Sequence, residues 1–336
     1  ILGDWAYKSV MYSIFFIQTG CGISGLIFAH QFLRSTFCIY EVKELCENPG
    51  YNALFFALVI IPLTFINNLH YFYIPSLFST IFLLVGLSAQ TYYNFDLLAA
   101  KDIGWNLFFD KLGEFNLLHL PLLFGVAIYA YEGVGILFEI RASMEKPGRF
   151  GRLLSWIMIS LVVIYTVFPS ISYLAFGEDT PDIILLSLPK SSSYLIVKSL
   201  YALSVVLVYP LQMAPSFKII EEIDFLKERL YSQNGKDINP PLKYSIRLLL
   251  QAIMIVIAIT TKSFQLFLNL IGSCFFTYLG FVLPVIMYKK AFEGKIPRWK
   301  KIVNWTAGVI GVVLGSIGIV LSIIEMFKYD EEPVGV

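Results

Sequence analysis

The stretch Leu117–Pro147 decides how the chain is interpreted, and its centre is Tyr131-Glu132-Gly133-Val134-Gly135. It begins as an apolar helix, is interrupted by a carboxylate and two glycines, and resumes as an apolar piece from Ile136. A charged side chain at bilayer depth is costly unless it faces a cavity or a partner. Glycine lowers helix propensity at the same point. The pattern therefore predicts a membrane helix that is broken at Glu132.

Freed backbone groups are tolerated in a membrane only where protein or water satisfies them. Discontinuous helices of this kind supply the substrate sites of many secondary transporters. The alternative interpretation is a kinked but closed helix in which Glu132 pairs with a neighbouring side chain. The two interpretations differ in whether the backbone at Gly133 and Gly135 is open to a ligand.

Composition shows that the bilayer is the solvent for most of the chain. Of the 336 residues, 57% are hydrophobic and only 15% are charged, against about 25% charged in ordinary globular chains. The mean hydropathy is +0.72. The net charge of +1 says nothing about partners, and no basic run interleaved with aromatic residues suggests nucleic-acid binding. The sequence therefore predicts an integral, multi-pass membrane protein.

A spanning helix needs roughly 20 mostly apolar residues, and by this criterion we predict nine spans. They form an all-α, polytopic helix bundle that occupies residues 1–336 as a single transmembrane domain. The predicted spans are about 9–33, 52–66, 70–93, 117–140, 153–176, 194–217, 244–260, 264–288 and 302–327.

Lysine and arginine in the loops predict the orientation of these spans. The basic loops 145–152, 218–247 and 289–301 all fall on one side of a nine-span arrangement, and the opposite loops are poorer in bases. These three loops are therefore expected on the cytoplasmic or equivalent inner side. The sequence does not resolve whether the membrane is the plasma membrane or that of an organelle, vacuolar, lysosomal or mitochondrial.

Three side features are open to alternatives. Cys38 and Cys46 share one predicted outer loop, where they either form a disulfide or stay free thiols. Lys198 lies about one turn from the end of its span, so we expect its ammonium to snorkel to the interface; the alternative is an inward-facing lysine with a role in transport. Residues Ile183–Pro189 are expected to form an extended or half-helical lid.

Four segments resemble the amino acid/auxin permease family, in the right order and over nearly the whole chain. The first is Tyr131–Gly135 followed by Met144 and Pro147, similar to that family's aromatic-Glu-Gly-x-Gly signature and its Met-Lys-x-Pro ending. The others are Phe176–Thr180 with Ile184–Pro189, Tyr209-Pro210-Leu211-Gln212 with Pro215 and Glu221, and Leu270–Ser273 through Phe281–Pro284.

The resemblance implies a leucine-transporter-like fold, which has two inverted five-helix repeats plus one further span. Matching Glu132 to the family's broken helix six makes the first span here the family's third. The chain as given, which begins at Ile1 and not at a methionine, would then hold nine of eleven expected spans and lack the first two. The family's proline, glutamate and asparagine after the break fall on Glu139, Arg141 and Ala142. Coupling through that family glutamate therefore does not carry over.

The leading functional hypothesis is a secondary active transporter, a symporter that moves small amino acids. Family members are usually driven by protons or sodium, so H⁺ or Na⁺ is the expected coupling ion, and no other cofactor or metal is predicted. The substrate would bind at Tyr131, Glu132, Gly133, Val134 and Gly135. The alternative is a non-transporting structural subunit or sensor that works with partner subunits in a larger membrane complex. An enzyme is not expected, because the three histidines lack metal-ligand spacing and no Ser-His-acid arrangement occurs.

Overall fold

The computed structural model describes residues 3–40, 42, 58–65, 73–100, 120–131, 141, 144–231, 238–261, 263–292 and 297–331. The chain divides into two compact units. Unit 1 comprises Ile1–Ser13, Thr91–Thr180 and Gln265–Val336, and unit 2 comprises Ile14–Gln90 and Pro181–Phe264. Because the placement of the parts relative to one another is not determined, each unit is described by itself.

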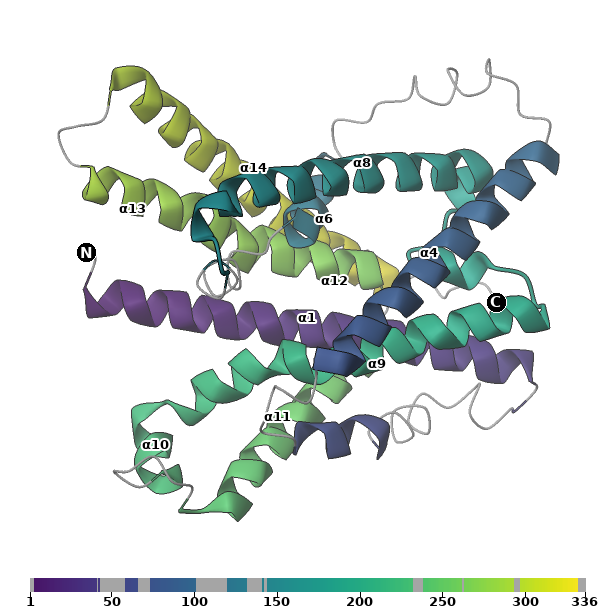
Figure 1. The fold of residues 1–336 in the computed structure, drawn as a ribbon, viewed down its shortest axis with the longest axis horizontal. Coiled ribbons are helices and arrows are strands. Elements are labelled where there is room, and N and C mark those ends of the chain that lie inside the picture. Colours follow the sequence, from purple (N-terminus) through teal and green to yellow (C-terminus); the bar gives the residue numbers. More distant parts are fainter. Residues whose placement is uncertain are drawn as a thin grey trace. The chain divides into compact units, whose positions relative to one another are not determined.

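Within the described ranges, seven helical runs are long and apolar enough to cross a membrane. Figure 1 labels them along the chain. They are α1 (Asp4–Ile39), α4 (Tyr73–Ala100), α8 (Phe150–Phe176), α9 (Ser192–Glu221), α11 (Pro240–Thr260), the continuous run from α12 (Phe264–Ile271) to α13 (Leu283–Ala291), and α14 (Arg298–Glu331). An all-helical, multi-pass membrane protein is therefore confirmed.

The surface of these helices fits lipid and not water. On α8, Ile159, Val162 and Val163 are each at least half exposed, and none of its most apolar stretch is buried. Contiguous exposed apolar surface of this extent is unusual in soluble monomers, whereas hydrocarbon accepts it without cost. Most faces of α8 are therefore suited to contact lipid and not other helices.

Two of the nine predicted spans are described only in part. The span predicted at 117–140 contains the shorter apolar helix α6 (Leu120–Tyr131), and the span at 52–66 contains helical residues 58–64. The count of nine and the inverted repeat therefore stay predictions. Long apolar helices lie at the other seven predicted positions, and most extend past at least one predicted end; α1 has 36 residues, far more than the roughly 20 that cross the hydrocarbon. The apolar residues predict only the part of a helix that crosses the hydrocarbon. Backbone hydrogen bonds continue the helix beyond that part.

In unit 2, glycines in the middle of α1 bring it close to two other helices, as the small residues there predict. A Cβ added at Gly22 would lie 2.5 Å from Met213 Sδ on α9 and 2.6 Å from Met254 Cε on α11. One turn along, a Cβ at Gly25 would meet Val205 Cγ1 of α9 at 3.3 Å. A larger side chain at Gly22 would therefore require the two methionine side chains to move.

The ends of α9 and α11 are joined through the short helix α10 (Asp224–Leu230), which contacts both of them (Figure 1). Glu221 is the last residue of α9, and α10 begins three residues later. Helix α11 begins at Pro240, and the side chain of Asn239 accepts a hydrogen bond from the Leu242 amide at 3.4 Å. Proline is favoured at a first helical position, where its missing N–H costs nothing.

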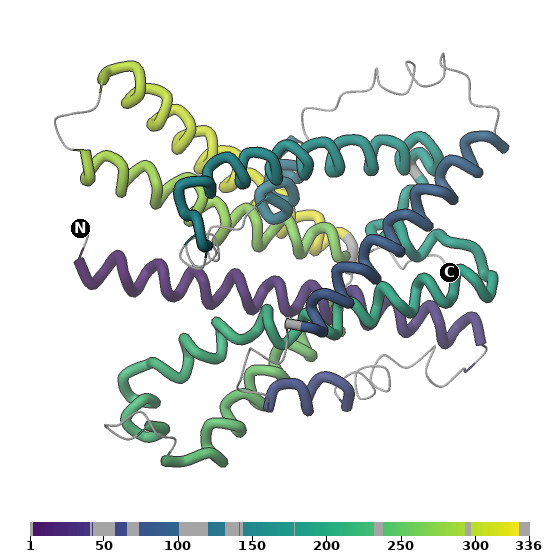
Figure 2. Tube along the Cα trace, in the orientation of Figure 1, coloured from purple at the N-terminus to yellow at the C-terminus, as the bar shows by residue number. Residues whose placement is uncertain are grey.

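In unit 1, α6 and α14 both contact η6 (Gly272–Phe276), a π-helical stretch that follows α12. A second π-helical stretch, η7 (Tyr278–Val282), leads into α13, and Figure 2 traces this run in light green. Helix α8 ends at Phe176, and Gly177 follows with φ 69° and ψ −138°. A positive φ favours glycine, so Gly177 ends this span at its predicted position.

Candidate functional site: the end of α6 and the contacts that hold it

Only the first of the five predicted substrate-binding residues is described. Tyr131 is the last described residue of α6 and is half-buried. Its ring packs edge-on against Tyr165 of α8, with 5.3 Å between the ring centroids. Glu132, Gly133, Val134 and Gly135 lie outside the described residues. The break in the helix and the ligand site therefore stay predictions, and the structure shows instead what positions the end of α6.

Helix α6 crosses the π-helical stretch η6 at a contact between two glycines. A Cβ built on Gly272 would lie 1.9 Å from the carbonyl oxygen of Gly125, and one built on Gly125 would lie 2.7 Å from the carbonyl oxygen of Asn269. Both obstacles are backbone atoms, which cannot rotate away as a flexible side chain can. The two helices approach this closely only because neither residue carries a side chain.

A buried amide ties the same crossing to α14. Asn269 of α12 has no exposed surface, and its amide nitrogen donates to the Gly318 carbonyl oxygen at 3.1 Å and to the Ser322 hydroxyl. The Ser273 hydroxyl donates to the Asn269 side-chain oxygen at 3.1 Å. A buried polar side chain is tolerated in a bundle when its groups are satisfied. Here the amide is satisfied on both sides.

Aromatic rings extend the contact of α6 along the same run. Phe124 packs against Phe281 with 5.7 Å between centroids, and Tyr129 packs edge-on against Phe276 with 5.3 Å between centroids. Both partners lie in the π-helical stretches, and between these stretches Thr277 Oγ1 donates to the Gly272 carbonyl oxygen at 3.1 Å. Stretches of π-helix are frequent at functional sites. The end of α6, and with it Tyr131, is thus fixed by glycines, an amide and two ring pairs.

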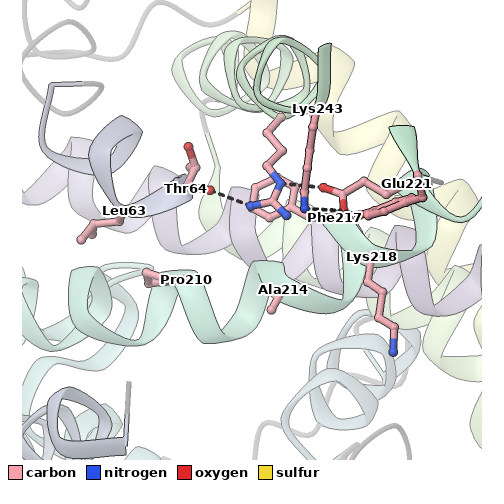
Figure 3. A pocket seen from close by; sticks show the side chains of 10 residues that line it. Leu63, Thr64, Pro210, Ala214, Phe217, Lys218, Glu221 and Lys243 are labelled. Carbon is pink, nitrogen blue, oxygen red and sulfur yellow. Dashed lines mark hydrogen bonds and ion pairs between the residues drawn. The ribbon is translucent and has the colours of Figure 1, made fainter. Parts of the chain in front are cut away.

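A second cluster lies in unit 2, where α9 ends and α11 begins. Glu221 and Arg247 are 4% and 7% exposed, and Arg247 Nε donates to Glu221 Oε1 at 2.6 Å. Arg247 Nη1 also donates to the Thr64 carbonyl oxygen at 3.0 Å, which brings in the helical segment 58–64. Figure 3 shows Lys243 and Thr64 close to this pair. One guanidinium therefore holds three separate segments of the chain.

Tyr231 and Lys243 complete this cluster. The Tyr231 hydroxyl donates to Glu221 Oε2 at 2.6 Å, and Lys243 Nζ lies 3.9 Å from the same oxygen. Burial, followed by the hydrogen bond to Glu221, raises the pKa of the Tyr231 phenol above its usual value of 10.0. The phenol therefore stays protonated and remains a donor at neutral pH. Both oxygens of the buried carboxylate are satisfied.

Lys198 does not reach the surface, so the prediction that it snorkels was wrong. It is 2% exposed, and its ammonium donates to the carbonyl oxygens of Leu186 at 3.1 Å and Leu188 at 2.9 Å. These carbonyls belong to or follow η5 (Ile184–Ser187), which confirms a part-helical segment between 183 and 189. A short 3₁₀ turn leaves carbonyls without helical partners, and the lysine satisfies them from within the unit.

Two further predictions concern cysteines and metals. Cys38 is disulfide-bonded, but Cys46 lies outside the described residues, so their pairing stays a prediction. Cys21 and Cys274 are free. Within the described ranges no group of three or more His, Cys, Asp or Glu side chains could hold a metal ion.

Sequence reasoning missed the Gly125–Gly272 crossing, the Asn269 amide and the Glu221–Arg247 pair. A signal existed for each, because glycine and asparagine interrupt otherwise apolar runs at these positions and Arg247 begins the apolar stretch of its span. What the sequence could not supply was the partner, which lies at a distance along the chain in every case.

Comparison with known proteins decides the family. Residues 1–328 match the family described as Transmembrane amino acid transporter protein. The chain belongs to this family. It is thus a membrane protein of an amino acid transporter family and not an enzyme, as the four motif segments indicated.

The similar curated proteins are transporters from fungi and a plant. The chain is 25% identical to Vacuolar amino acid transporter 4 of Saccharomyces cerevisiae over 316 residues, which cover 86% of this chain and 43% of that protein. It is 27% identical to Vacuolar amino acid transporter 3 of Schizosaccharomyces pombe over 265 residues, 78% of this chain and 37% of that protein. It is 24% identical to Amino acid transporter ANT1 of Arabidopsis thaliana, over 91% of this chain and 70% of that protein. The chain therefore spans less than half the length of the two fungal relatives.

Proposed function

We propose that this protein is a secondary active transporter of small amino acids. The observation that carries the proposal is the match to an amino acid transporter family over residues 1–328. Its support within the chain is the carboxylate and glycine sequence Glu132–Gly135, which directly follows a helix held in place by close backbone contacts. A bundle core that is rigid up to Tyr131 is what a substrate site next to it requires.

The proposed substrate site is the backbone and side chains from Tyr131 to Gly135. Half-helix ends carry partial charges of opposite sign, so a break in mid-membrane stabilises both the carboxylate and the ammonium of an amino acid. Gly133 and Gly135 would let the ligand approach the backbone closely. Glu132 would hold the unwound turn or carry a coupling proton.

The proposed driving force is a gradient of protons or sodium, and the proposed setting is an organellar membrane. The second point follows from the fungal relatives, whose names place them in the vacuole. Because Glu132 is a carboxylate that could carry a proton, a proton gradient is the first driving force to test. Replacement of sodium, with the proton gradient kept, distinguishes the two ions.

The test is uptake of labelled amino acids by the full-length protein in proteoliposomes. Glu132→Gln keeps the size of the side chain and removes its charge, so we expect gradient-driven uptake to fall by about tenfold or more, the effect of losing roughly 1.4 kcal/mol of stabilisation. Glu145→Gln is the matched control, because Glu145 is exposed in the segment before α8. Uptake that is unchanged in Glu132→Gln would remove this carboxylate from the mechanism. A folded wild-type protein without any uptake would favour a non-transporting subunit.

A further inference from the structure

Unit 2 contains a cavity of about 230 Å³ beside the end of α9. It opens where three segments meet, namely α9, the start of α11 and the helical segment 58–64. Its lining residues are Leu63, Thr64, Pro210, Ala214, Phe217, Lys218, Glu221, Tyr231, Lys243 and Arg247. None of these lining residues belongs to the proposed substrate site at 131–135, so the cavity is considered as a separate binding site.

The guanidinium of Arg247 lines one side of the cavity and has N–H groups that make no hydrogen bond to the described residues. Arg247 carries five N–H donors in a planar fork, and its hydrogen bonds among the described residues use Nε and Nη1. Its Nη2 group has no acceptor in the part of the chain that the structure describes. Arg247 is only 7% exposed and lines the cavity, so an acceptor in the cavity can reach these donors.

The charge of the lining is mainly positive. Three of the lining residues are bases and one is an acid. Figure 3 shows the Lys243 side chain directed into the cluster, whereas the side chain of Lys218 points away from it. The one acid, Glu221, already accepts hydrogen bonds from Arg247 and Tyr231, one on each oxygen. An anion at Arg247 Nη2 would therefore meet two cationic side chains and a carboxylate that is already neutralised.

The other wall of the cavity is apolar and comes from α9 and the helical segment 58–64. Leu63, Pro210, Ala214 and Phe217 form it, and the charged cluster lies toward the end of α9 that leads into the basic segment 218–247. Basic pockets between membrane helices bind anionic lipid head groups, and this cavity combines basic side chains with an apolar wall in the same way. A lipid would contact both walls, whereas a small soluble phosphate would contact mainly the charged one.

We propose that this cavity binds a phosphate monoester, presented by an anionic lipid headgroup or by a small soluble molecule. The guanidinium edge and the Lys243 ammonium hold the phosphate oxygens, since a planar fork matches phosphate geometry and an ammonium binds it as a point charge. The Arg247 Nε–Glu221 hydrogen bond stays in place, because the phosphate uses the other edge of the guanidinium. The site thus needs no rearrangement of the ion pair that joins α9 to α11.

The experiment measures binding to the purified full-length protein in phosphatidylcholine nanodiscs. One arm adds a phosphatidylinositol monophosphate to the nanodiscs and counts bound lipid by native mass spectrometry. The second arm titrates inositol monophosphate against lipid-only nanodiscs by calorimetry. The test variant is Lys243→Gln and the matched control is Lys218→Gln, a base on the same end of α9 whose side chain points away. The double variant Glu221→Met with Arg247→Met removes the fork together with its partner.

We expect Lys243→Gln to weaken binding about tenfold or more, as loss of one charge-assisted hydrogen bond does. The double variant should abolish binding, and Lys218→Gln should leave it within about twofold of wild type. This pattern in the lipid arm alone identifies a lipid headgroup, and the same pattern in both arms identifies the phosphate group itself. Absence of binding in both arms, or an equal loss in Lys218→Gln and Lys243→Gln, would overturn the proposal. Neither outcome depends on whether the protein transports amino acids.

Discussion

In unit 1, α6 meets the run Phe264–Ala291 through two glycines, whereas in unit 2 the ends of α9 and α11 meet through a buried carboxylate and a buried guanidinium. The first contact is made by backbone, with Gly272 against Gly125. The second is made by long side chains, with Arg247 against Glu221 and the Thr64 carbonyl. Both contacts join segments that are far apart in the sequence.

The difference follows from the position of each contact along its helices. Between apolar spans there is no hydrophobic gain from association, so helices are held by close packing and by hydrogen bonds between small or polar residues. The Gly125–Gly272 crossing, with Asn269 and Ser322 beside it, has this composition. The Glu221–Arg247 pair lies near the end of α9 and the start of α11, next to a polar segment. Charged residues are common in such a segment, unlike in the apolar middle of a span. Close backbone packing therefore holds the helices of unit 1 together at the Gly125–Gly272 crossing. An ion pair holds the end of α9 to α11 in unit 2.

The largest effect is expected from breaking the ion pair on one side. Arg247→Met keeps most of the side-chain volume but removes the cation that donates to the buried Glu221 carboxylate at 2.6 Å and leaves it only Lys243, at 3.9 Å. Leaving one partner of a buried pair costs about 3–5 kcal/mol, so the thermal midpoint of the purified protein should fall strongly. Because two apolar residues can replace a buried pair at little cost, Glu221→Met with Arg247→Met should be less destabilised than the single variant. An equally or more destabilised double variant would mean that the two charges are not coupled.

A smaller effect is expected from closing the glycine contact. In Gly272→Ala the new Cβ would lie 1.9 Å from the Gly125 carbonyl oxygen, so the crossing has to open, at a cost of about 1–3 kcal/mol. The control is Gly280→Ala in the second π-helical stretch, where an added Cβ has no heavy atom within 4 Å. We expect that control to match wild type in thermal midpoint and in gel-filtration profile. Equal behaviour of the two alanine variants would contradict the backbone contact.

The smallest effect is expected from the amide beside that crossing. Asn269→Leu removes the hydrogen bonds to Gly318, Ser322 and Ser273 but keeps a similar volume. Hydrogen bonds between membrane helices contribute about 0.6 kcal/mol each on average, so a loss of roughly 1–2 kcal/mol in stability is expected. Denaturant-induced unfolding in detergent measures it. A more stable leucine variant would show that the amide is kept for a reason other than stability.

The sequence predicted membrane spans well because apolarity alone defines them. All seven long helical runs coincide with predicted spans, and the glycines of the first span do lie at close helix contacts, as Gly22 shows. The end of the fifth span at Gly177 was also predictable, because a positive φ after a helix favours glycine. These features depend only on residues that are close together in the sequence, so they can be predicted from it.

Features that depend on a distant partner could not be predicted in the same way. Lys198 was expected at the interface, but the carbonyls of Leu186 and Leu188 satisfy it inside unit 2. Arg247 was counted among the cytoplasmic bases, yet it is buried against Glu221. A lysine or arginine near a helix end has the same sequence signal whether it snorkels or pairs, and only the fold brings the partner to it.

The central claim is that the helix is open at Glu132 and that an amino acid binds there. Hydrogen exchange at the backbone amides of residues 132–135 tests it most directly, with the amides of the Phe124–Tyr129 stretch of α6 as an internal reference. In the full-length protein in nanodiscs, we expect the amides of 132–135 to exchange much faster than the reference and to slow when a transported amino acid is added. Amides that are as protected as those of α6, and that do not respond to any amino acid, would contradict the claim.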